Sequence, residues 1–117
     1  MFFKKKKHPK CFCGTSVLIQ AMAETIAIDA GIIDILFSYQ GKQHCVGMSS
    51  EHTHRRGFYD TEFYLDNQIF TDFETFKAEA ALNGILFAEI PDKVEVLTAD
   101  DMPPHNYTIF ERYLTEV

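Results

Sequence analysis

Tryptophan is absent from this sequence, and glycine and proline are scarce, with 6 and 4 positions among 117 residues. This scarcity excludes collagen-like and low-complexity chains, and 46% hydrophobic beside 24% charged residues excludes a wholly disordered one. No run of about 18 apolar residues occurs, so no membrane-spanning helix is predicted. The length suits one domain with its own core. The 11 phenylalanines and 5 tyrosines predict that this core is aromatic.

Cysteine is also rare and occurs only at Cys11, Cys13 and Cys45. An odd, small number of cysteines does not form the disulfide framework of a small secreted protein. We therefore expect reduced thiols and a cytoplasmic location. A secretory leader is the alternative, because a run of lysines precedes an apolar stretch and an Ala-Met-Ala sequence at 21–23. The residues at 11–16 are, however, a poor hydrophobic region for such a leader.

Basic charge is scarce in the second half of the chain. From residue 60 to the end, 13 acidic residues stand against Lys77, Lys93 and Arg112, and the whole chain has a formal net charge of −6. An acidic body repels phosphate backbones, which makes nucleic acid an unexpected partner. Neither of the common glycine-rich phosphate-binding motifs occurs. The charge instead favours a basic surface on an unidentified protein partner.

Five charged residues are the candidate partner-binding positions. Glu89, Asp92 and Glu95 lie in the acidic half and would face a basic partner. Arg55 and Arg56 lie in a polar loop, where they could bind an anion. The alternative for both groups is a solvated surface that only keeps the protein soluble.

The apolar pattern divides the chain into a basic, cysteine-containing arm over residues 1–14 and a single α+β domain over residues 15–117. Apolar residues at helical spacing predict a helix over residues 16–30. Ser16 is a suitable N-cap for it, and Gly31 a suitable stop.

A β-hairpin is predicted over residues 35–48. Apolar and polar residues alternate around Gly41-Lys42, a pair typical of a two-residue type II′ turn. This turn predicts three cross-strand pairs: Tyr39 with His44, Phe37 with Val46, and Ile35 with Met48. The three pairs share one face of the sheet, which is therefore apolar.

The second half predicts further strands and helices. Strands are expected at residues 58–65, 68–70 and 94–97, and a short helix at 106–115. A capping box at Thr71 and Glu74 predicts the start of another helix, which Asn83-Gly84 would end. We therefore predict an α+β fold with a mainly antiparallel sheet of about four to five strands, packed on one face by two to three helices.

Two groups of metal-ligand residues lie in segments predicted as loops. Cys11 and Cys13 end the arm, and His52 and His54 lie in the polar loop. Four nitrogen and sulfur ligands suffice for a tetrahedral zinc site, so these residues predict one if the fold joins the two loops. The Cys-x-Cys spacing is weaker evidence than Cys-x-x-Cys. The alternative is two unrelated loops with no metal.

No catalytic arrangement stands out. Cys45 follows His44, but neighbouring residues on a strand point to opposite faces and cannot form a nucleophile pair. The acidic residues between 60 and 72 supply carboxylates, yet acid–base catalysis needs two of them in one cleft. We therefore expect no enzymatic activity.

The leading hypothesis is a small non-enzymatic cytoplasmic module that binds or regulates a protein partner through an acidic surface. The alternative is a zinc-binding protein or metal-dependent enzyme built on the cysteine and histidine ligands, and a third is a small hydrolase that uses Cys45.

One sheet face should remain uncovered, which favours a homodimer or a partner strand. It would carry Leu36, Ser38, Gln40, Gln43, Cys45, Gly47 and Tyr64.

Overall fold

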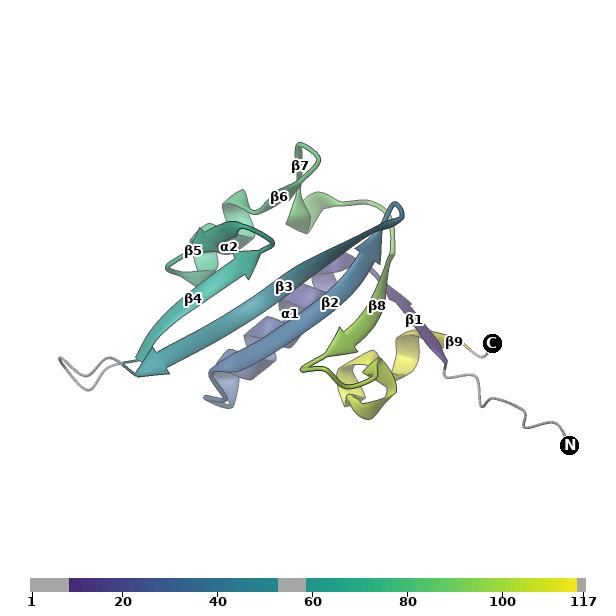
Figure 1. The fold of residues 1–117 in the computed structure, drawn as a ribbon, viewed down its shortest axis with the longest axis horizontal. Coiled ribbons are helices and arrows are strands. Elements are labelled where there is room, and N and C mark those ends of the chain that lie inside the picture. The colour runs from purple at the N-terminus through teal and green to yellow at the C-terminus, as the bar shows by residue number, and fades with distance from the viewer. Residues whose placement is uncertain (1–8, 53–58, 116–117) are drawn as a thin grey trace, which may run out of the picture.

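The computed structural model describes residues 9–52 and 59–115. These residues form a seven-stranded antiparallel sheet, a separate two-stranded hairpin, two α-helices and three short 3-10 helices (Figure 1). The predicted α+β class and the antiparallel sheet are confirmed. The sheet has more strands than the four to five predicted.

The elements and their bounds follow the chain. They are β1 (Lys10–Cys13), α1 (Thr15–Ala27), β2 (Ile32–Tyr39), β3 (Lys42–His52), β4 (Tyr59–Leu65), β5 (Gln68–Phe70), α2 (Phe73–Glu79), β6 (Ala81–Leu82), β7 (Ile85–Leu86), η1 (Phe87–Glu89), β8 (Val94–Ala99), η2 (Pro104–Asn106), η3 (Thr108–Tyr113) and β9 (Leu114–Thr115). The strand order in the large sheet is β5-β4-β3-β2-β8-β1-β9. The first and last strands of the chain are therefore neighbours at one edge.

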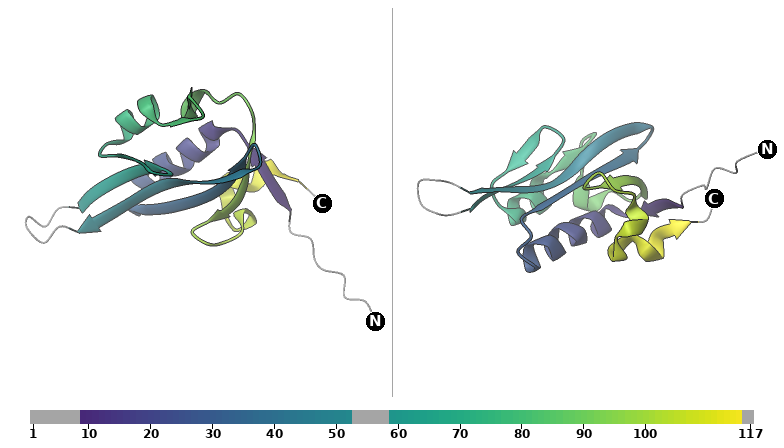
Figure 2. Two further views of the ribbon diagram at one scale, coloured as in Figure 1. Left: turned by 45° about the horizontal axis from the view of Figure 1, so that its top comes forward. Right: turned by 60° about the horizontal axis from the view of Figure 1, so that its bottom comes forward.

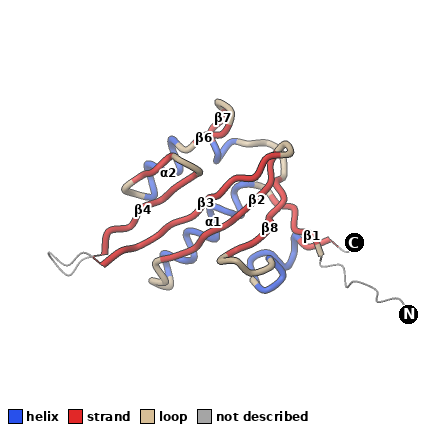
Figure 3. The backbone as a smooth tube through the Cα atoms, in the orientation of Figure 1, coloured by secondary structure: helices blue, strands red, loops and turns tan. Residues whose placement is uncertain are grey.

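The helices lie on one side of the large sheet. Figure 1 shows α1 running behind β2 and β3, and the turned views of Figure 2 show the same helix along one face. Figure 3 shows the strands as a continuous layer in front of α1. No described helix covers the opposite face. Within the described part of the chain, no helix has the length and apolarity needed to cross a membrane.

The core lies between α1, α2 and the sheet, and it is aromatic as predicted. Phe76 is fully buried at its centre. The Phe76 ring lies 6.2 Å from Phe87, 6.5 Å from Phe63 and 5.8 Å from Phe70, measured between ring centroids. Phe37 extends the cluster from β2, with its centroid 5.8 Å from that of Phe87. Offset and edge-to-face contacts of this kind stabilise a core beyond the area that they bury.

The predicted arm joins the sheet before residue 14. Lys10–Cys13 form β1, in which Cys11 pairs with Val96 and Cys13 with Val94 of β8. Both cysteines are fully buried, whereas Lys10 is exposed and Phe12 is half-buried. This alternation has the two-residue period of a strand. The expectation that residues 10–13 lie outside the sheet is therefore wrong, because β8 supplies hydrogen bonds that the sequence alone does not reveal.

The predicted hairpin exists, but its register differs by two residues. The turn is Gln40-Gly41, and both residues have positive φ, 51° and 76°. Two positive φ values make a type I′ turn, which replaces the type II′ turn predicted at Gly41-Lys42; both types match the twist of a hairpin. A shift of two keeps every side chain on its face, so the apolar face is confirmed and the pairs change. They are Tyr39 with Lys42, Phe37 with His44, and Ile35 with Val46.

Other predicted boundaries also change. Helix α1 covers Thr15–Ala27 rather than residues 16–30, and its N-cap is Gly14 rather than Ser16. The N-cap of α2 is Asp72 rather than Thr71, since the Asp72 carboxylate accepts the Thr75 amide at 2.7 Å. The helix ends at Glu79, and Asn83-Gly84 instead turns the β6–β7 hairpin with positive φ at both residues. The final segment forms the 3-10 helix η3 and the short strand β9 rather than an α-helix.

Candidate functional site

The C-terminal end of α1 exposes apolar side chains. The buried residues of α1 end at Thr25, whose hydroxyl donates to the Ala21 carbonyl at 2.8 Å. Beyond it, Ile26 is 42% exposed and Ile28 is 76% exposed. The chain then turns through Gly31, at φ 79°, into β2, where Ile32 is 57% exposed. Isolated exposed isoleucines are ordinary, but Ile28 and Ile32 flank one turn and line the same groove, which marks a surface that can bind.

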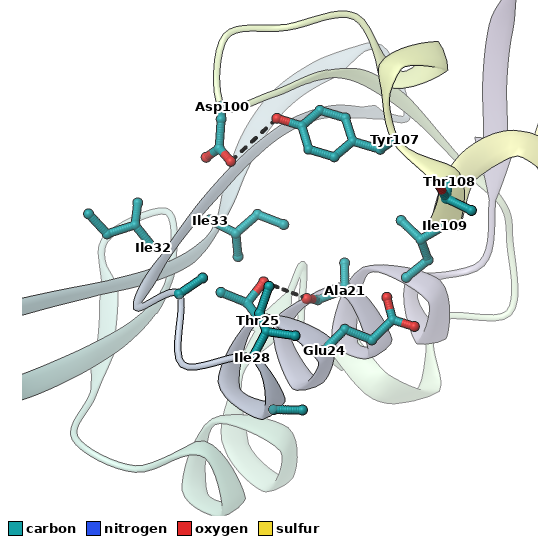
Figure 4. A pocket seen from close by; sticks show the side chains of 12 residues that line it. Ala21, Glu24, Thr25, Ile28, Ile32, Ile33, Asp100, Tyr107, Thr108 and Ile109 are labelled. Carbon is teal, nitrogen blue, oxygen red and sulfur yellow. Dashed lines mark hydrogen bonds between the residues drawn. The ribbon is translucent and has the colours of Figure 1, made fainter.

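A groove of about 550 Å³ opens beside this turn (Figure 4). It lies between the second half of α1, the start of β2 and the segment that follows η2. Its apolar wall consists of Ala21, Ala27, Ile28, Ala30, Ile32, Ile33 and Ile109. Its polar side chains are Glu24, Thr25, Asp100, Tyr107 and Thr108. An apolar hollow with a few convergent polar groups is the usual form of a binding site.

Glu24 and Asp100 are the only charged residues among the described residues that line the groove. Both are acidic and solvent-exposed. Arg112 lines a separate hollow on another side of Glu24, and no ion pair between the two occurs in the described part of the chain. The groove therefore presents negative charge beside an apolar wall.

Asp100 is held in place by three hydrogen bonds. Its Oδ1 accepts the Asp34 amide at 2.8 Å, its own amide donates to the Asp34 carbonyl at 2.7 Å, and its Oδ2 accepts the Tyr107 hydroxyl at 3.4 Å. Asp100 and Asp101 have φ of 50° and 64° and form the two-residue turn between Ala99 and Met102. Burial and the nearby Asp100 charge raise the pKa of Tyr107, so its hydroxyl remains a donor.

The two predicted zinc-binding cysteines face the core from β1. Cys11 and Cys13 are fully buried. The neighbouring Cys11 thiol and burial raise the pKa of the Cys13 thiol, which disfavours the thiolate that zinc requires. These cysteines pack as small apolar residues among the strands.

The structure does not bring these cysteines to His52. The backbone of His52 ends β3 and pairs with Tyr59, whereas β1 is separated from β3 by both β2 and β8. His54, Arg55 and Arg56 lie outside the described residues. Within the described residues, no three His, Cys, Asp or Glu side chains are grouped as metal ligands. The zinc site stays a prediction.

The three acidic residues predicted for partner binding lie near the start of β8. Glu89 ends η1 and Asp92 precedes β8, and both are exposed, while Glu95 is half-buried opposite Phe12 and Ser38. Asp100 of the groove lies just beyond the other end of β8. The structure therefore separates these residues from the groove.

His44 and Cys45 point to opposite faces, as predicted. His44 is buried, lies with its ring centroid 5.5 Å from that of Phe37, and places Nδ1 2.6 Å from Asp66 Oδ2. Asp66 Oδ1 accepts the Cys45 amide at 2.9 Å. Burial and the charges of Asp34 and Asp66 raise the pKa of the Cys45 thiol, which opposes the ionisation that a nucleophile needs.

On the uncovered sheet face, the Tyr64 side chain of β4 lies across β3 and reaches β2. Asp34, Gly47 and Tyr64 are cross-strand neighbours on β2, β3 and β4, and the Tyr64 hydroxyl donates to the Asp34 carboxylate over Gly47. A Cβ on Gly47 would lie 2.1 Å from the Ile33 carbonyl oxygen and 2.9 Å from the Tyr64 hydroxyl. Glycine is therefore required where the tyrosine crosses.

The groove was not predicted from the sequence. Its residues come from α1, β2 and the segment after β8, and only the tertiary fold joins them. One local signal existed, because Ile26, Ile28 and Ile32 surround a glycine turn, but the same pattern also fits buried residues.

Comparisons with known proteins give no match: no family model, no curated protein and no solved structure shows significant similarity to this chain.

Proposed function

We propose that this chain is a non-enzymatic binding module whose groove takes a basic, apolar segment of a protein partner. One observation carries the proposal. The groove beside α1 has an apolar wall, and its charged lining residues, Glu24 and Asp100, are both acidic. Lysine and arginine side chains complement this charge, and an aliphatic side chain complements the wall.

The exposed isoleucines supply the energetic argument. Covering an exposed isoleucine side chain contributes about 1.5–3 kcal/mol when burial is complete. Ile28 and Ile32 are more than half exposed, so a partner that covers both would gain a substantial part of that amount twice. The net charge of −6 adds steering of a basic partner, an effect that weakens as salt increases.

Selection from a random peptide library tests the proposal. Twelve-residue displayed peptides would be selected on the full chain and measured against Glu24→Gln/Asp100→Asn and against Ile32→Ser. We expect selected peptides to combine lysine or arginine with aliphatic residues and to bind each groove variant at least about tenfold more weakly, which corresponds to about 1.4 kcal/mol. The Asp100→Asn change keeps the acceptor Oδ1 and suits the positive-φ turn.

A second acidic surface provides the matched control. Glu89→Gln/Asp92→Asn removes the same number of charges from exposed positions near the start of β8. Equal affinity for this control and for the unmodified chain supports the groove. If the control weakens binding and the groove variants do not, the partner surface is the one predicted from Glu89, Asp92 and Glu95. If no peptide depends on either surface, the binding function is contradicted.

A further inference from the structure

One end of β2 has an unpaired edge next to the groove. Pairing between β2 and β8 begins at Ile35, which lies opposite Ala99. At Asp34 the edge is closed by Asp100, which binds both the amide and the carbonyl of Asp34. Beyond Asp34, toward the turn, no described strand lies on this side of β2, because β8 has already turned away at Asp100.

The backbone groups of Ile32 point to this edge. In a strand, the amide and carbonyl of one residue point to the same side, and residues two apart share that side. Since both groups of Asp34 are directed to Asp100, the groups of Ile32 are directed to the same side rather than to Ser49 of β3. Ile32 therefore offers one donor and one acceptor beside the groove that it lines.

The surroundings of this edge are suited to an extended chain. Alternate side chains of an added strand point to opposite faces of the sheet, so those on the helix side would enter the hollow next to Ile33 and Ile109. Asp100 lies one pair further along the edge, at Asp34. Its carboxylate lies in line with the added strand and favours a cationic side chain there.

We infer that the groove binds its partner segment as an extended strand that pairs with Ile32, places an aliphatic side chain between α1 and η3, and directs a lysine or arginine to Asp100. This inference rests on the proposed function and specifies the conformation of the partner. A helical segment is a different occupant, since a helix has no backbone donors or acceptors left for Ile32 along its length.

Amide-to-ester substitution tests the inference. Each amide of the tightest groove-dependent peptide from the selection would be replaced in turn by an ester, which removes one N–H donor and keeps the side chains. We expect one position to lose about 2- to 12-fold in affinity, the range of a single net hydrogen bond, and its neighbours to lose little. We also expect the Ile32 amide proton of the full chain to exchange with solvent more slowly when this peptide is bound.

Two results would overturn the inference. One is a bound peptide with helical carbon chemical shifts. The other is a flat ester series together with unchanged exchange of the Ile32 amide. Either leaves the proposed function standing, because the peptide would still depend on Glu24, Asp100 and Ile32. A selection that yields no groove-dependent peptide overturns both proposals and is thereby distinguished from these two results.

Discussion

The two ends of α1 are built from similar apolar residues and have opposite surroundings. At the start, Thr15, Val17 and Leu18 are buried, and the Thr15 hydroxyl donates to the Phe87 carbonyl at 2.6 Å. At the other end, Ile28 is exposed beside the open groove and Ile26 beside a separate hollow. Figure 2 shows α1 running from the end of β1 to the turn before β2.

The difference teaches that apolar residues on this helix have two separate roles. The start of α1 is joined to the core by packing and by a hydrogen bond between residues 72 positions apart. The end contributes little to that core, because its isoleucines lie outside it. Apolar surface that does not stabilise the fold is available for binding.

The largest expected effect on stability lies in the aromatic core. Phe76→Ala removes a fully buried ring from the centre of the aromatic cluster. We expect the free energy of unfolding to fall by about 3–5 kcal/mol, measured by denaturant titration. A loss below about 1 kcal/mol would show that the cluster is not the main stabilising element, and the comparison between the two ends of α1 would no longer hold.

The second effect concerns the start of α1. Thr15→Val removes the hydroxyl donor to the Phe87 carbonyl, which keeps the Ile90 amide as a second donor at 3.4 Å, so we expect a loss of about 0.5–1.5 kcal/mol in the same titration. Ser16→Ala is the matched control. Ser16 is exposed and makes no capping bond, since the N-cap is Gly14, so its replacement should change stability by less than about 0.5 kcal/mol.

A smaller effect depends on pH. Hydrogen bonds from Thr75 hold the pKa of Asp72 below its ordinary value of 3.8, so the ionised form stabilises α2 in the folded state. This contribution is present above about pH 4 and is lost as the pH falls through the folded pKa. We expect the stability difference between the unmodified chain and Asp72→Ala to shrink from pH 5 to pH 2. A difference that grows toward acid would contradict this assignment.

The smallest effect on stability is expected at the C-terminal end of α1. Ile28→Ala should change the free energy of unfolding by less than about 0.5 kcal/mol, because the side chain is 76% exposed. Thermal and denaturant unfolding would both measure it. A loss comparable with that of Phe76→Ala would mean that the end of α1 is a part of the core, and the groove would then have a structural role.

The sequence predicted the elements whose signals are local. Alternation around Phe37 gives β2 and β3, and helical spacing before Gly31 gives α1. The register of the hairpin depends on which two residues form its turn. Residue types alone do not show that these are Gln40 and Gly41 rather than Gly41 and Lys42. For β1 and β9 the signal is weaker still, because a two- to four-residue strand is stabilised by its neighbour rather than by its own pattern.

The candidate site shows the same division. The acidic charge was visible from composition, and it still supports a basic partner. The location of the groove was not visible, since Glu24 and Asp100 are 76 positions apart and line the same groove only after α1, β2 and β8 have assembled. The burial of Cys11 and Cys13 was likewise not visible, because these residues enter the core only through the pairing of β1 with β8, which no spacing rule in the sequence reveals.

The crossing at Gly47 has a consequence for recognising related chains. Three consecutive strands carry an aspartate, a glycine and a tyrosine in one cross-strand row, and the contact over the glycine leaves no room for a side chain. Any chain that retains the crossing has to retain glycine in its middle. The order aspartate, glycine, tyrosine on adjacent strands is therefore the pattern to look for in a chain proposed to share this sheet.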